Sequence, residues 1–109
     1  MKIYISGPIS SLPPAQARAN FAAAAAAIRK KGHEPVNPCK LQEILDPETT
    51  AWNQYMRLAF ALLEVCDAVV FLPGWERSKG AVLESAHAQQ YCLHVFETLD
   101  EIWPAAPQE

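Results

Sequence analysis

The sequence of 109 residues has no run of Lys and Arg longer than three residues, and its formal net charge at pH 7 is −3. Proteins that bind nucleic acid through the phosphate backbone present a basic patch or stripe. Nucleic-acid binding is therefore not expected. No apolar run approaches the roughly 18 residues that a membrane-spanning helix requires, so we expect no membrane partner either.

No metal-ligand spacing occurs between any two of the three cysteines, which are Cys39, Cys66 and Cys92. Three cysteines cannot all pair within one chain. We expect small buried thiols in a reducing compartment, with no metal site. The chain passes from its first residue directly into a strand pattern, "MKIYISG", with no signal-peptide pattern, so a cytoplasmic location is expected.

A phosphate-binding P-loop is also missing, because no GxxxxGK[ST] motif occurs. No cofactor is expected. Half of the residues are hydrophobic, which is enough for a core at this length. The length suits a single domain covering residues 1–109.

Four short apolar segments alternate with helical patterns along the chain. The predicted strands are 2–6, 33–38, 67–73 and 92–97, and the predicted helices lie within 12–32, 49–65 and 78–91. This alternation predicts an α/β fold, with a parallel sheet of four or five strands ordered around residues 67–73 and helices on both faces. Pro104 and Pro107 suggest that the tail is flexible from about residue 104.

Two loops with unusual chemistry follow predicted strands: "SGPISS" at 6–11 and "PGWERSKG" at 73–80. Ligands of open parallel sheets bind beyond the carboxyl ends of the strands. The two loops are therefore predicted to form the walls of one pocket.

The second loop leads into a predicted helix whose first residues are Ser78, Lys79 and Gly80. Free backbone N–H groups and the helix dipole make such a start an anion site. The alternative is that Ser78 serves only as a helix cap.

Glu84 lies within this helix, between small residues one turn away on either side, Gly80 and Ala88. A ligand could approach its carboxylate closely, although a glutamate on a helix is more often a solvated charge. Trp75 could stack on a base or merely cover the edge of the core.

Several segments together resemble the DUF4406 family, a small branch of the nucleoside 2-deoxyribosyltransferase-like superfamily. They are "IYISGPIS", "NF" at 20–21, "GHEPVNP" at 32–38 and "CDAVVFLPGWERSKGAVLE" at 66–84. The resemblance extends to about residue 97. It implies a flavodoxin-like or Rossmann-like three-layer fold and assembly into homodimers or larger homo-oligomers. The superfamily includes nucleoside 2-deoxyribosyltransferases and nucleoside 5′-monophosphate N-glycosidases.

The resemblance also implies roles for two catalytic residues. Glu84 matches the family's nucleophile, which attacks the anomeric carbon of the sugar, and Tyr4 matches the tyrosine that orients this glutamate. The loop after the first strand matches the lining of the sugar-phosphate site, which here consists of Gly7, Pro8, Ile9 and Ser10.

Ser78 and Gly80 match the residues that hold the 5′-phosphate in the nucleotide hydrolases of the superfamily. In the deoxyribosyltransferases an aspartate is typical six positions before the nucleophile. The serine found here therefore favours a phosphorylated nucleotide as the ligand.

One departure from the family concerns Ala59, eight residues before Asp67. Active relatives carry an aspartate there that protonates the leaving base. Three hypotheses remain open: an N-glycosidase or 2-deoxyribosyltransferase, a nucleotide-binding sensor module without turnover, and a structural subunit whose alanine-rich helix builds an oligomer. Ala59 favours the sensor, whereas Glu84, Tyr4 and Ser78 together favour the enzyme.

Overall fold

Four parallel strands form the centre of the computed structural model within residues 1–106, the part of the chain that it describes. The strand order is β2-β1-β3-β4. The strands are β1 (Lys2–Ser6), β2 (Glu34–Val36), β3 (Ala68–Phe71) and β4 (His94–Phe96). The predicted parallel α/β fold is confirmed, and β1 shares the centre of the sheet with β3.

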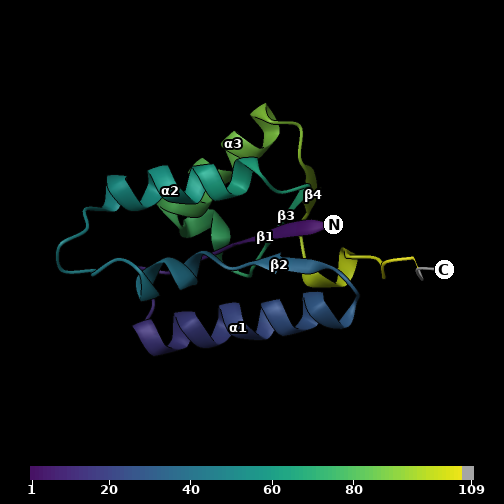
Figure 1. The fold of residues 1–109 in the computed structure, drawn as a ribbon, viewed down its shortest axis with the longest axis horizontal. Helices are drawn as coiled ribbons and strands as arrows, with labels where there is room; N and C mark the ends of the chain where they lie inside the picture. Colours follow the sequence, from purple (N-terminus) through teal and green to yellow (C-terminus); the bar gives the residue numbers. More distant parts are fainter. Residues whose placement is uncertain (107–109) are drawn as a thin grey trace.

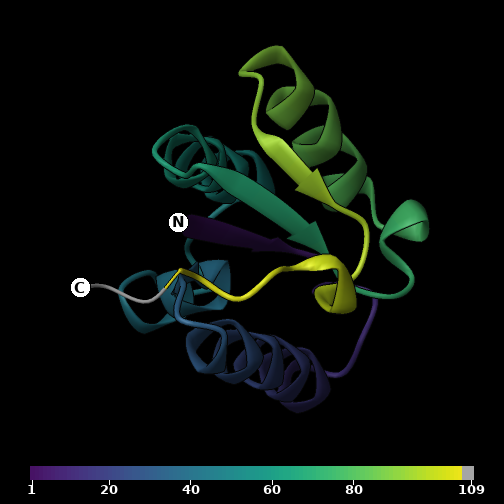
Figure 2. The same ribbon diagram turned by 90° about the vertical axis from the view of Figure 1, so that its right-hand side faces the viewer.

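The helices cover both faces of the sheet, which gives three layers (Figures 1 and 2). They are α1 (Pro14–Lys30), α2 (Trp52–Glu64) and α3 (Lys79–Gln90). Helix α1 packs on one face, and α2 and α3 lie side by side on the other. Short 3-10 turns occupy Pro38–Glu43, Trp75–Arg77 and Leu99–Glu101.

The two central strands are buried on both faces because successive side chains point to opposite sides of a strand. On β1, Ile3 and Ile5 pack toward α1, whereas Tyr4 packs toward α2 and α3. The side chains of β3 alternate in the same way, with Val70 packed toward α1 and Val69 packed toward α2 and α3. Burial on both faces explains the uninterrupted apolar run in the sequence.

Alanines let α1 lie close to the sheet. Ala24 and Ala25 are buried against it, between the larger buried side chains of Phe21 and Ile28. The helix ends just before Gly32, whose φ of 86° is in the left-handed region that favours glycine. The predicted end of this helix is therefore confirmed.

The segment after β4 folds back onto the turn between α1 and β2. Ile102 is buried, and Lys31 donates from Nζ to the Ile102 carbonyl at 2.8 Å. Ala105 donates its backbone N–H to the Lys31 carbonyl at 2.8 Å. The tail that was expected to be flexible from about residue 104 is thus hydrogen-bonded at Ala105, and the rest of that prediction, at 107–109, lies outside the described residues.

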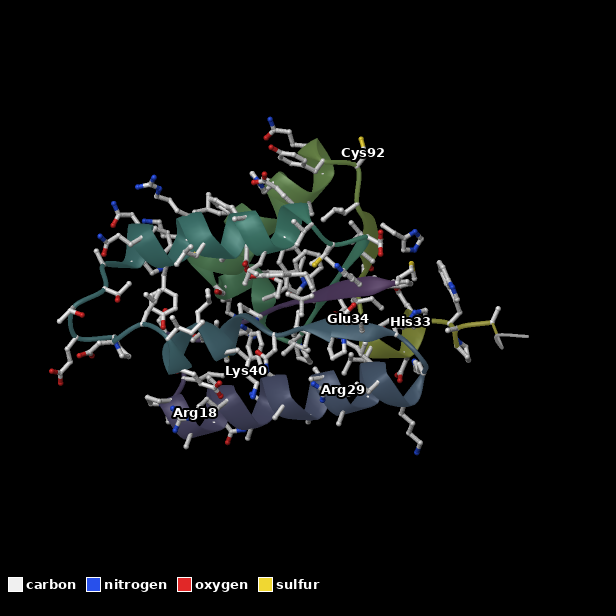
Figure 3. The ribbon with its side chains drawn as sticks, in the orientation of Figure 1. Arg18, Arg29, His33, Glu34, Lys40 and Cys92 are labelled. Carbon is white, nitrogen blue, oxygen red and sulfur yellow. The ribbon has the colours of Figure 1, made fainter. Side chains whose placement is uncertain are left out.

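Two of the three cysteines are buried, as expected, and the third is not. Burial raises the pKa of the Cys39 and Cys66 thiols to about 11. The prediction of burial is wrong for Cys92, which is exposed at the outer end of α3 (Figure 3). Its φ of 58° belongs to the sharp turn between α3 and β4, which carries its side chain away from the core.

No helix in residues 1–106 combines the length and apolar character needed to cross a membrane. Over the same residues, no group of three or more His, Cys, Asp and Glu side chains is arranged to hold a metal ion.

Candidate functional site

A cleft of about 430 Å³ is bounded by the loop after β1, the first turns of α3 and one face of α2. Most of the predicted site residues line it: Tyr4, Gly7, Ile9, Ser10, Ser78, Gly80 and Glu84. Two loops that are about 70 positions apart in the sequence therefore do meet at one hollow, as predicted. Pro8 and Trp75 do not line it.

The carboxyl group of Glu84 is held by two hydroxyl groups from β1. The Tyr4 hydroxyl donates to Oε2, and the Ser6 hydroxyl donates to Oε1 at 2.9 Å. Tyr4 and Ser6 are alternate residues of one strand, so both face the helix that carries Glu84. Only 6% of Glu84 is exposed, which identifies it as a buried carboxyl group and not a solvated surface charge.

The small neighbours of Glu84 on α3 allow this close approach to the sheet. Ala88, one turn later, is fully buried, and Gly80, one turn earlier, lines the cleft. A Cβ atom at Gly80 would lie 3.4 Å from the sulfur of Met56 on α2. Helices α2 and α3 therefore approach each other at the cleft.

Burial raises the pKa of the Glu84 carboxyl group to about 7, although the hydrogen bonds from Tyr4 and Ser6 act in the opposite direction. Burial, followed by the charge of Glu84, raises the pKa of Tyr4 well above its usual value. Tyr4 is therefore a neutral phenol that donates its proton. About half of the Glu84 groups carry a negative charge near neutral pH.

The titration of Glu84 predicts how stability depends on pH. An exposed glutamate in the unfolded chain has a pKa of about 4.3, whereas burial raises the folded-state pKa to about 7. The native state is therefore favoured while the group is protonated and loses stability as pH rises from about 4.3 through 7. Relative to Glu84→Gln, we expect the wild type to lose about 3 kcal/mol of unfolding free energy across this range.

Denaturant unfolding of both proteins from pH 4 to 8.5 measures this loss. The difference between them removes the contribution of the other titrating groups. Curves that stay parallel over this range would contradict the raised pKa.

Ser6 begins the loop at 6–11 that is predicted to form one wall of the pocket, but it is not predicted as a site residue of its own. It nevertheless contacts the central carboxyl group directly. A signal for it exists in the sequence. A polar residue two positions after Tyr4 shares the same face of a predicted strand, and a buried strand has few polar residues.

The start of α3 has the expected cap. The Ser78 hydroxyl accepts a hydrogen bond from the Ala81 N–H at 3.4 Å. Next to it, the ammonium group of Lys79 lies 4.8 Å from the ring centre of Trp52 on α2. The N-terminus of α3, the ring of Trp52 and the ammonium group of Lys79 therefore lie close together.

Gly7 is required by packing, independently of any ligand. A Cβ atom there would lie 2.8 Å from Cβ of Leu72, which follows β3. Pro8 lies against the other loop, since its Cγ would be 3.5 Å from a Cβ atom at Gly74. The loops that follow β1 and β3 are therefore closely packed against each other.

Trp75 lies away from the cleft, against Phe71, with 4.4 Å between the ring centres. The aromatic residues that do line the cleft, besides Tyr4, are Trp52 and Tyr55 of α2, neither of which is a predicted site residue. The Tyr55 hydroxyl is buried without a hydrogen-bond partner among the described residues. Helical spacing links both residues to Ala59, which is the signal that could have found them.

Ala59 lines the cleft and is 6% exposed, so the position at which the family resemblance implies an aspartate does face the site. The nearby acidic residues do not line the cleft. Glu64 pairs with His87 at 2.8 Å, and Asp67 accepts a hydrogen bond from the Lys2 N–H at 2.8 Å. Glu84 is therefore the only carboxyl group in the described lining of the cleft.

Known proteins resemble this chain at the level of family and fold. The family model described as "Domain of unknown function (DUF4406)" matches residues 1–97. No curated protein matches the chain.

Two solved structures have a similar fold. A 2-desoxiribosyltransferase from Leishmania mexicana is 23% identical with a TM-score of 0.63, and the match covers 86% of this chain and 61% of that one. A CMP N-glycosidase from Clostridium botulinum is 16% identical with a TM-score of 0.57, and the match covers 87% of this chain and 66% of that one. This chain therefore spans less than two thirds of the length of either protein.

Proposed function

Since this chain belongs to the DUF4406 family, within the nucleoside 2-deoxyribosyltransferase-like superfamily, we propose that it cleaves the N-glycosidic bond of a nucleotide or nucleoside. The favoured substrate is a nucleoside 5′-monophosphate. The observation that carries the proposal is the buried carboxyl group of Glu84, held by two hydroxyl groups inside a cleft. The fold shared with a transferase and an N-glycosidase supports it.

In the proposed reaction, a carboxylate oxygen of Glu84 forms a bond to the anomeric carbon as the bond to the base breaks. The electron pair of the broken bond stays on the base nitrogen, which takes a proton from water or from a substrate group. Water or a second base then attacks the anomeric carbon and releases the carboxylate. Covalent capture divides one difficult step into two easier ones, because the sugar ring develops positive charge.

The phosphate is proposed to bind at the start of α3, where Ser78 and Gly80 line the cleft. A helix rises about 1.5 Å per residue, so Ser78 and Glu84 are separated by roughly 9 Å along its axis. This separation suits a phosphate at one end and the anomeric carbon at the other. The free N–H groups of a helix N-terminus favour an anion there.

Ser78→Ala is expected to weaken binding of 5′-monophosphates about 10- to 100-fold, because a hydrogen bond to a charged group is lost. Binding of the matching nucleosides should change less than about twofold. Isothermal titration calorimetry with both ligands measures the difference. Ser78→Thr keeps the hydroxyl and the cap and serves as the control, and an equal loss for both ligands would contradict the phosphate site.

The alternative function is a nucleotide-binding sensor of the same fold, and Ala59 is the observation that favours it. Loss of a general acid lowers rates by about 10²–10⁴-fold. Incubation with a panel of ribo- and deoxyribonucleoside monophosphates, followed by chromatography for free base, tests the enzyme. Calorimetric binding without base release would favour the sensor.

The assembly and location of the chain remain predictions. Exposed apolar side chains on α2 and α3, among them Leu58, Val82 and Leu83, are compatible with the proposed homodimer. A cytoplasmic location fits a nucleotide substrate.

A further inference from the structure

Ser6 is the second residue of β1 whose hydroxyl group contacts the carboxyl group of Glu84. It is completely buried and does not belong to the cleft lining, whereas Tyr4 and Glu84 do. Its hydroxyl is 2.9 Å from Oε1 of Glu84, and the Tyr4 hydroxyl contacts Oε2. One strand thus supplies a hydrogen-bond donor to each oxygen of the same carboxyl group.

We propose that Ser6 is a positioning residue for Glu84, whose hydroxyl fixes the orientation of the carboxyl group and holds it in the charged form that attacks the sugar. The part of this proposal that concerns attack on the sugar rests on the proposed function. The part that concerns the charge of Glu84 rests only on the hydrogen bond between Ser6 and Glu84.

The physical basis is the competition between burial and hydrogen bonding. Burial disfavours the charged carboxylate, and each donor restores part of its stability. With both donors in place, burial still leaves the pKa of Glu84 raised to about 7. Without the Ser6 hydroxyl, Oε1 would have no donor from β1, and the balance would shift toward the neutral acid.

Few other groups could set this balance. The titratable group in contact with Glu84 is Tyr4. On α2, Tyr55 also lines the cleft and is a neutral phenol near pH 7, because burial raises its pKa. The other residues that α2 presents to the cleft carry no charge: Trp52, Met56 and Ala59. Cys39 and Cys66 act on Tyr4, and burial raises the pKa of both thiols to about 11, so they are neutral near pH 7.

Ser6→Ala is expected to move the titration midpoint of Glu84 upward by about one to two pH units, the effect of one hydrogen bond to a charged group. At pH 7 the carboxylate fraction then falls about 5- to 50-fold, and kcat falls with it. KM should change little, because Ser6 does not line the cleft. At a pH well above the new midpoint, most of the lost rate should return.

Carbon NMR of protein labelled at the glutamate carboxyl carbon measures the midpoint without any substrate. The Glu84 signal is assigned by its disappearance in Glu84→Gln. Ser6→Thr retains the hydroxyl and is expected to titrate near the wild type. Ser85→Ala removes a neighbouring hydroxyl of α3 that is not bonded to this carboxyl group, and it should leave the midpoint unchanged.

A wild-type midpoint in Ser6→Ala would overturn the proposal. So would a shift in Ser6→Thr or Ser85→Ala as large as that in Ser6→Ala. If the midpoint moves as expected but the wild type releases no base from any nucleotide, the proposed function fails and the control of the Glu84 charge by Ser6 stands.

Discussion

Glu84→Gln is expected to lower base release by more than about 10³-fold, as is usual when a covalent nucleophile is lost. The amide is nearly the same size as the carboxyl group but cannot form the ester to the anomeric carbon. Single-turnover release of base from the best nucleotide of the panel measures the loss.

The fold should survive this change. The amide oxygen of the substituted side chain can accept from Tyr4, and its amide nitrogen can donate to the Ser6 hydroxyl, so both contacts with β1 can be kept. Circular dichroism and calorimetric binding should therefore match the wild type at pH 7. Glu64→Gln, which changes an acidic residue paired with His87 outside the cleft lining, is the matched control and should retain full activity. Activity retained in Glu84→Gln would remove the nucleophile from the proposal.

The sheet could be predicted because its signals are local. The apolar run at β3 requires cover on both faces, and helical patterns between strands require parallel crossovers. The end of α1 could be predicted from Gly32 because the left-handed backbone conformation after a helix favours glycine at that one position. The order of the strands depends on contacts between residues that are far apart in the sequence. For this reason the sequence did not predict that β1 lies beside β3 at the centre of the sheet.

The site was predictable where its residues follow strand ends and was missed where they come from α2. Gly7 and Ser78 lie in loops whose composition is unusual, so they could be identified locally. Tyr55 looks like an ordinary core residue in the sequence, and only the packing of α2 beside α3 brings it to the cleft.

Trp75 illustrates the limit of reading loops from sequence. Its ring packs against Phe71, after a left-handed Gly74, and does not line the cleft. The composition of the loop carries no information on where the ring packs. Ser6 is the opposite case, because the two-residue period of a strand links it to Tyr4.

Ala59→Asp is expected to raise base release by about 10²–10⁴-fold, the usual contribution of a general acid. Ala59 lines the same cleft as Glu84, so an aspartate there would face the ligand that Glu84 attacks. The position is 6% exposed as alanine, and burial of this kind raises the pKa of a carboxyl group. The new aspartate would therefore be held in the protonated form that can deliver a proton to the leaving base.

Ala59→Asn is the matched control, because asparagine has the same shape and hydrogen-bonding reach but does not act as an acid. Single-turnover base release at several pH values compares the two variants with the wild type, and thermal unfolding checks that both remain folded. A gain for aspartate alone, lost again in the double variant with Glu84→Gln, would show that the cleft holds a working nucleophile that lacks only its acid. If aspartate and asparagine behave alike in folded proteins, a missing proton donor at this position does not limit turnover, and the sensor function becomes the better description of the chain.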